Sequence, residues 1–209
     1  FRSDTILDGG VYLILTKPDN NYFEFLIGSE TDQHFTITTK KEGPDMVRNL
    51  KIEGSDDNKV FVDYLHYLGQ KSKESEQASK RTQELDSLIN TNASEEQKKA
   101  WGEEKSKHVD FLNNMSKEVE TYQKNMIAKN PKYLSSNLIK AAQNPVVPKE
   151  IEAKGQPHPY YYFKEHYFDG LDWGDKRLIR TPVMEQKIEY YLDKLTVQAP
   201  DSCITSADY

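Results

Sequence analysis

The stretch SEEQKKAWGEEKSKHVDFLNNMSKEVETYQKNM, residues 94–126, decides the fold because it joins a helix start to a long apolar repeat. Ser94 and Gln97 form a capping-box pattern, in which two side chains satisfy free amides of the first helical turn. Six side chains then recur at steps of four and three residues, as on one face of a packed helix. They are His108, Leu112, Met115, Val119, Tyr122 and Met126. The stretch therefore predicts a long helix.

A second long helix is predicted just before this one. From Ser55 onward, side chains recur at three- and four-residue steps, with Lys71 and Ser75 interrupting the apolar series, and Asn90-Thr91-Asn92 breaks the pattern. The repeating residues are Phe61, Tyr64, Leu68, Ala78, Thr82, Leu85 and Ile89. Two helices of roughly 35 residues predict an antiparallel hairpin over about 56–129, on the order of 50 Å long at 1.5 Å per residue.

The outer half of this hairpin, from about Gln70 to Glu104, is poor in apolar residues and is expected to project as a solvated arm. Trp101 lies near its tip and is a candidate interface residue, because large aromatic side chains contribute disproportionately to binding energy. The alternative is an ordinary two-helix spacer in which Trp101 packs back on Leu85 and Leu88.

The residues before the hairpin have the alternating pattern of strands. Apolar side chains alternate over residues 11–16 and 22–39, with Pro18-Asp19-Asn20-Asn21 as a turn between the first two runs. Three or four antiparallel strands of this length make a small sheet. The sequence thus predicts an α+β chain, with an incomplete antiparallel β domain at 1–54 and a helical domain at 55–209.

Shorter helices are predicted after the hairpin, in a compact C-terminal region. Asn130 is a candidate N-cap for a helix over 131–143 that has Pro131 in its first turn. A proline-punctuated connection follows, and Thr181-Pro182 begins another helix. Its expected buried stripe consists of Val183, Ile188, Tyr191, Leu192 and Leu195.

An aromatic run between these helices is where a binding site is sought. Its candidate binding residues are Tyr160, Tyr161, Tyr162, His166, Tyr167, Asp169 and Trp173. The first interpretation is a packed helix corner, with Phe163, Tyr167 and Gly170 on one face and His166 donating a hydrogen bond to a carboxylate or carbonyl. The second interpretation is a surface that binds a peptide or glycan.

Catalysis or metal binding by this run ranks last, because His166 and Asp169 supply only two of the three or four ligands that a metal needs. The sequence predicts no catalytic residue, no metal and no cofactor. The single cysteine, Cys203, cannot form an internal disulfide and has no catalytic neighbour in the sequence. The net charge of −6 argues against a protein that binds nucleic-acid backbones, and no apolar run is long enough to cross a bilayer.

Several motifs together resemble a region of unassigned function from exported Bacteroidetes proteins, where β-rich and helical parts precede a thioredoxin-like domain. In the C-terminal third these motifs are His166-Tyr167-Phe168-Asp169, Arg177-Leu178-Ile179-Arg180-Thr181-Pro182, and Tyr191-Leu192-Asp193-Lys194-Leu195 followed by Pro200-Asp201-Ser202. The earlier ones are Gly10-Val11-Tyr12-Leu13, Phe23-Glu24-Phe25-Leu26-Ile27, Gln33-His34-Phe35-Thr36, and Gly54-Ser55 with Asn58 and Phe61 to Leu65.

The resemblance implies that the parent is a thiol–disulfide oxidoreductase whose catalysis belongs to the following domain, so this chain is not itself the enzyme. It implies export, to the periplasm or to a membrane surface through an upstream lipid anchor. The expected partners are the chain's own thioredoxin-like domain, a protein substrate or a second copy. Because the chain begins at Phe1 and ends soon after a helix-start signal at Asp201 and Ser202, we expect a fragment. The alternative is a stand-alone periplasmic or surface module that binds a peptide or glycan through Tyr160 to Trp173.

Overall fold

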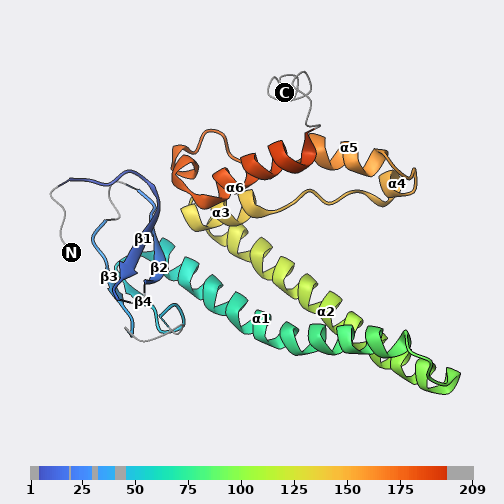
Figure 1. The fold of residues 1–209 in the computed structure, drawn as a ribbon. Coiled ribbons are helices and arrows are strands. Elements are labelled where there is room, and N and C mark those ends of the chain that lie inside the picture. The colour runs from blue at the N-terminus through green and yellow to red at the C-terminus, as the bar shows by residue number, and fades with distance from the viewer. Residues whose placement is uncertain (1–4, 19, 30–32, 41–45, 197–209) are drawn as a thin grey trace.

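A computed structural model describes residues 5–18, 20–29, 33–40 and 46–196. It is an α+β structure in which two small antiparallel sheets precede a long helical hairpin and a group of shorter helices (Figure 1). The predicted fold class is therefore confirmed.

The strands form two separate sheets. β1 (Gly10–Thr16) pairs with β2 (Asn21–Ile27), and β3 (Thr36–Thr38) pairs with β4 (Lys51–Glu53). The sequence predicted that the strands form one small sheet, and that prediction is wrong. The two pairs contact each other through buried side chains instead of ladder hydrogen bonds, and β3 and β4 are only three residues long. The buried cluster comprises Phe23, Met46, Leu50, Ile52 and Val62.

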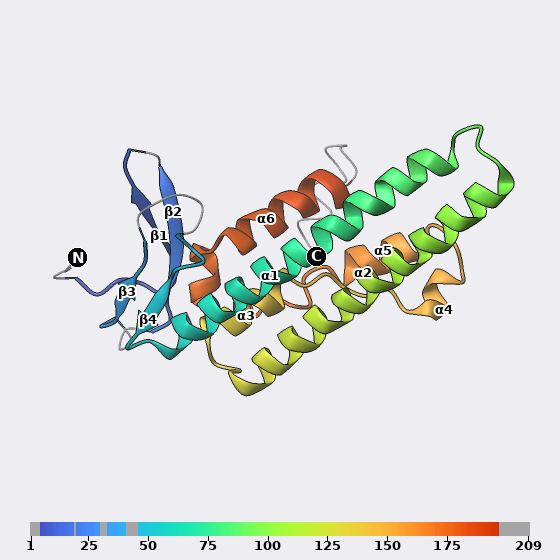
Figure 2. The ribbon, with the colours of Figure 1, turned by 90° about the horizontal axis from the view of Figure 1, so that it is seen from below.

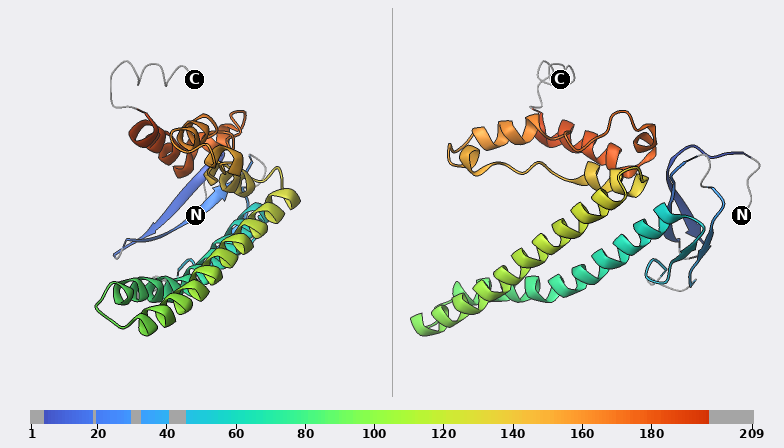
Figure 3. Two further views of the ribbon diagram at one scale, coloured as in Figure 1. Left: turned by 90° about the vertical axis from the view of Figure 1, so that its right-hand side faces the viewer. Right: turned by 180° about the vertical axis from the view of Figure 1, so that it is seen from behind.

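The helical hairpin consists of α1 (Asp56–Ile89) and α2 (Glu95–Lys129), close to the predicted range of 56–129. Ser94 and Gln97 form both bonds of the capping box, which confirms the predicted helix start. The hairpin extends well beyond the rest of the molecule (Figure 3). In its outer half, ion pairs such as Arg81 with Glu104, at 2.8 Å, join the two helices.

The next helix, α3 (Leu134–Ala142), begins three residues later than predicted. Asn130 is the C-cap of α2, so its assignment as the N-cap of α3 is wrong. The side chain that caps α3 is Asp57 of α1, which accepts hydrogen bonds from the amides of Leu134 at 2.7 Å and Ser135 at 3.0 Å. A cap from a distant helix leaves no local pattern in the sequence.

Five short elements follow α3 in the described residues up to 196. They are α4 (Lys149–Glu152), α5 (His158–Glu165), the 3-10 helix η2 (Lys176–Arg180), α6 (Pro182–Tyr190) and a π-helical turn, η3 (Tyr191–Leu195). They form a second arm that leaves the region of α3 at an angle to the α1–α2 hairpin (Figures 1 and 3).

The start of α6 at Thr181-Pro182 is confirmed, but its expected buried stripe is only partly correct. Ile188 and Leu192 are exposed, whereas Lys187 is buried. Tyr191 and Leu195 remain on the inner side, and the π-helical turn between them has a wider spacing than the periodicity that the prediction assumed.

The main core joins the β and helical parts around α3. Its members are Leu26 of β2, Phe61 of α1, Leu134, Leu138 and Ala141 of α3, and Leu171 and Leu178 from the second arm. The boundary near residue 54 therefore marks a change of secondary structure, while the hydrophobic core continues across it. Gly170 allows the closest approach here, since a Cβ at this position would lie 2.5 Å from the carbonyl oxygen of Lys140.

Candidate interaction site

Tyr167 is the centre of the aromatic run. It is 5% exposed, and its ring lies 5.6 Å from Phe163, 5.1 Å from Phe168 and 5.7 Å from Tyr190. Helix α5 ends at Glu165, so the run is a helix followed by turns instead of one continuous helix. The packed corner that the sequence suggested is present around Tyr167.

Other rings of the run lie at the surface. Tyr161 is 61% exposed and Trp173 is 67% exposed. The Trp173 ring lies 5.8 Å from that of Phe168, and the Tyr161 ring lies 5.5 Å from that of Tyr160. The cluster therefore has a packed centre and at least two exposed rings, each of which lies next to another aromatic ring of the run. A ring held by its neighbours can contact a ligand with little loss of side-chain entropy.

The remaining predicted residues stabilise the corner. The hydroxyl group of Tyr160 donates a hydrogen bond to the carbonyl of Leu195 at 2.8 Å, and the Tyr162 ring lies 4.2 Å from the His166 ring. His166 Nδ1 lies 2.7 Å from Asp169 Oδ2, which confirms the expected bond between histidine and a carboxylate. Within residues 5–18, 20–29, 33–40 and 46–196, no group of three histidine, cysteine or acidic side chains is arranged to hold a metal.

Lys187 packs against this corner, and the sequence pattern did not indicate that it is buried there. Its side chain is directed inward, where Nζ donates to the carbonyls of Tyr167 at 2.9 Å and Gln143 at 3.2 Å. The same Nζ lies 4.0 Å from the centre of the Tyr167 ring, within cation–π range. Burial lowers the pKa of Lys187 below its ordinary value. The lysine thus connects α6 to the end of α3 and to the turn after α5.

A charged junction lies near the start of α3. Arg177 forms a double ion pair with Asp175, through Nε at 2.8 Å and Nη2 at 2.7 Å, and its Nη1 donates to the carbonyl of Gly28 at 2.6 Å. Asn137 of α3 donates to Asp175 at 2.6 Å. The hydrogen bonds from Arg177 and Asn137 hold the pKa of Asp175 below its usual value, against the opposing effect of burial. The junction links β2, α3 and η2.

A pocket of about 570 Å³ opens beside this junction, with Asp56, Asp57, Lys132, Tyr133 and Arg177 among its lining residues. Its central charges already have protein partners. Asp57 uses both carboxylate oxygens on the amides that begin α3, and Arg177 binds Asp175 and two backbone carbonyls. These groups therefore hold the elements together and are not available as a ready set of ligands.

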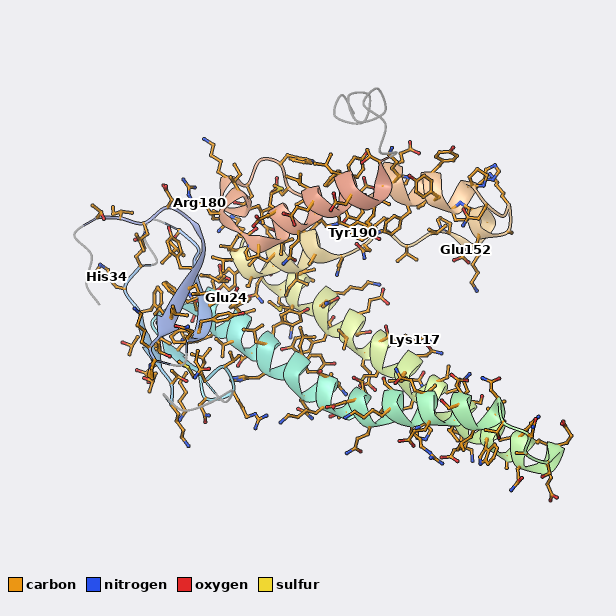
Figure 4. All side chains as sticks on the ribbon, in the orientation of Figure 1. Glu24, His34, Lys117, Glu152, Arg180 and Tyr190 are labelled. Atoms are coloured by element: carbon orange, nitrogen blue, oxygen red, sulfur yellow. The ribbon has the colours of Figure 1, made fainter. Side chains whose placement is uncertain are left out.

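Trp101 lies in the second turn of α2, near the far end of the hairpin, and is half-buried. The far end of the hairpin is well separated from the second arm, on which Tyr190 lies (Figure 4). The structure therefore does not join the candidate interface residue to the aromatic run. Cys203, Asp201 and Ser202 lie outside the described residues.

Comparison with known proteins finds a match to a protein family. The family model "Domain of unknown function (DUF5106)" matches residues 90–209, from the end of α1 to the C-terminal end of the chain. Searches of curated proteins and of solved structures found no match. Since the family model covers more than half of the chain, this protein belongs to the DUF5106 family of unknown function.

Proposed function

We propose that the chain is a non-catalytic accessory region of an exported thioredoxin-like thiol–disulfide oxidoreductase. It would recognise a protein substrate, orient the following domain or mediate assembly. The observation that carries this proposal is the set of hydrogen bonds and ion pairs made by Asp57, Asp175 and Arg177. They hold the β hairpin, α1, α3 and η2 together, so the α1–α2 hairpin and the second arm are attached to the same group of elements.

The charges of the junction support a scaffold more than an active site. A catalytic acid or base needs a free position facing a substrate, whereas Asp57 and Asp175 are occupied by backbone amides, Asn137 and Arg177. The arms, in contrast, expose broad surfaces. Two extended arms attached to the same group of elements suit a protein that positions one protein relative to another.

The identity of the parent rests on the motif resemblance, and three of those motifs lie in the second arm. One motif forms the turn after α5, another spans η2 and the start of α6, and a third is η3. Export to the periplasm, or tethering at its membrane, belongs to the same proposal. None of the described helices has the length and hydropathy of a membrane span.

The first test uses the gene and its full-length product. We expect the reading frame to continue beyond Tyr209 into a thioredoxin-like domain with a CxxC motif. In that product, Trp101→Ala should lower kcat/KM for a protein disulfide and leave kcat/KM for a small aromatic disulfide unchanged, because only the protein substrate reaches the arm. Equal losses for both substrates would contradict a recognition role for the arm.

The second test uses the chain alone. The 209-residue chain should not reduce insulin above the uncatalysed rate, and Cys203→Ser should not change this result. Turnover that disappears in the Cys203→Ser variant would overturn the non-catalytic assignment.

The second candidate function is binding of a peptide or glycan at the aromatic run, favoured by the exposed Trp173 ring packed on Phe168. Trp173→Ala should then abolish ligand binding and change stability by less than about 0.5 kcal/mol, as at other exposed positions. Tyr167→Ala should instead cost roughly 3–5 kcal/mol, because it removes a buried ring. Glycan-array and peptide-array binding, with denaturant melts of both variants, would separate the two roles. Wild-type levels of binding by Trp173→Ala would exclude this surface.

A further inference from the structure

Among the residues that the structure describes, no strand pairs with the outer edge of β1. In the described part of the chain β1 pairs only with β2. Opposite Val11, Leu26 has its N–H and its C=O bound by the Asn58 side chain, each at 2.7 Å, on the side away from β1. Because backbone groups alternate in direction along an antiparallel pair, Val11, Leu13 and Leu15 direct theirs to the outer edge of β1.

The side chains beside this edge are apolar and exposed. Leu13 is 52% exposed and Leu15 is 50% exposed, and Tyr22, which pairs with Leu15, is 56% exposed. Their side chains share one face of the hairpin, on which Val11 packs against the core. The turn end of the hairpin stands clear of the helices (Figure 2). An apolar strip therefore lies next to unused hydrogen-bonding groups.

β1 has none of the residues that usually protect a strand edge. Its sequence, Gly10-Val11-Tyr12-Leu13-Ile14-Leu15-Thr16, contains no charged residue and no proline. Natural edge strands use lysine, proline or bulges to prevent pairing with another chain. The other edge of the hairpin differs, since Asn58 covers Leu26 and the next outward position is Glu24, on β2 (Figure 4).

We propose that β1 is a dimerisation strand, which pairs antiparallel with β1 of a second copy about a two-fold axis at Leu13. Leu13 would face its counterpart, and Val11 would face Leu15 of the other copy. All six side chains would lie on one face of a four-stranded sheet. The inference does not depend on the proposed function.

Charge favours pairing of two copies through the β1 edge over pairing through the β2 edge. In the four-stranded sheet the two Glu24 side chains would be three strand spacings apart, roughly 14 Å. That separation exceeds the Debye length of about 8 Å at physiological salt, so their repulsion would be small. A symmetric pairing through the β2 edge about Glu24 would place the two carboxylates directly opposite each other. Closed two-fold dimers are also the commonest soluble assemblies.

Sedimentation equilibrium of the 209-residue chain tests the proposal. We expect a concentration-dependent species of twice the 24.2 kDa of one chain. Leu13→Lys places two like charges opposite each other at the axis and should weaken the dimer at least tenfold. The control is Ile179→Lys, which adds the same charge at a 70% exposed apolar residue on η2 and should leave the dimer intact. Circular dichroism melts confirm that each variant is folded.

A charge-exchange experiment separates pairing at β1 from a general effect of charge. Leu13→Lys and Leu13→Glu should each be monomeric, and an equimolar mixture of the two should recover a dimer that contains one of each. A monomeric wild type, or a mixture that stays monomeric, would overturn the proposal. So would a longer gene product that is monomeric while the 209-residue chain dimerises, since this would assign the β1 edge to another strand of the same chain.

Discussion

The carboxylate of Asp57 connects two helices that are distant in the sequence. It lies in the first turn of α1, yet both of its oxygens bind amides at the start of α3, 77 and 78 residues later. The same carboxylate disfavours any side chain at Gly28, because a Cβ there would lie 2.8 Å from Asp57 Oδ2. One buried residue thus fixes the spacing of β2, α1 and α3.

Asp57→Ala is therefore expected to lower the free energy of unfolding by about 2–3 kcal/mol, since it leaves two buried amides without an acceptor. Asp56→Ala is the matched control, because the neighbouring side chain is 75% exposed and forms a surface ion pair with Lys59 at 3.0 Å. That control should change stability by less than about 0.5 kcal/mol. Urea unfolding monitored by circular dichroism measures both. Equal effects would show that the cap is not the important contact.

Gly170 gives a prediction that depends on the absence of a side chain. Gly170→Ala should destabilise the protein by about 1–3 kcal/mol, because the new Cβ would press on the backbone of α3 at Lys140. Gly69→Ala should instead stabilise it by about 0.5–1 kcal/mol, since this helical glycine has nothing within 4 Å of its Cβ position. Thermal melts of the two variants should shift in opposite directions, and shifts of the same sign would contradict this packing.

Asp175 should make stability depend on acidity. Its folded-state pKa is below the unfolded value, about 3.9 for aspartate, so its stabilising effect is complete above that pH and is lost as pH falls through the folded pKa. Asp175→Asn should therefore weaken the loss of stability on acidification. The control is Asp193→Asn, at an exposed position on η3. Unfolding free energies measured from pH 7 to pH 2 would show parallel curves for Asp175→Asn and wild type if the expectation is wrong.

At the scale of elements, periodicity and local caps located the helices well. Ser94 with Gln97 identified the start of α2, and Thr181-Pro182 identified the start of α6, because each signal lies within one helical turn. The misplaced features depend on tertiary contacts. The cap of α3 comes from another helix, and the inward direction of Lys187 depends on the carbonyls of Tyr167 and Gln143.

The outer part of the hairpin is expected to be its least stable region. Between about residues 70 and 104, exposed ion pairs such as those of Arg81 and Lys105 join α1 and α2, and such pairs add little stability. Ala78 and Leu85 are the buried apolar side chains in this range, a lower density than in the inner part of α2. Amides there should exchange faster than those from 112 to 126, where Met115 and Met126 are buried. Hydrogen exchange followed by mass spectrometry measures this. Uniformly slow exchange would indicate that the arm is covered by a second copy or partner.

At the scale of the molecule, the sequence predicted the α+β class and the hairpin but not how the parts are joined. The aromatic run gave both a packed centre at Tyr167 and exposed rings at Tyr161 and Trp173, and pattern alone could not assign each ring to its side. The junction of Asp175 and Arg177 was not recognised because its partners are distant in the sequence; the carbonyl of Gly28 lies 149 residues from Arg177. Long-range polar contacts of this kind have no sequence period.

The last prediction concerns the angle between the two arms. Arg177 bonds the carbonyls that follow β2 and precede α3, so it should limit movement of the second arm relative to the hairpin. Spin labels at Lys99→Cys and Tyr161→Cys, with Cys203→Ser as background, would report the distance between the arms by pulsed electron paramagnetic resonance.

A narrow distance distribution is expected for the otherwise unchanged protein, and Arg177→Ala should broaden it, since Asp175 would lose its cation and two carbonyls would lose a donor. Arg180→Ala is the control on the same 3-10 helix, because its ion pair with Asp8 is exposed and worth little. If Arg177→Ala leaves the distribution as narrow as the control does, the hydrophobic core around α3 is sufficient to fix the arms. The charged junction would then contribute only to stability, and its contacts would no longer support a positioning role for the chain.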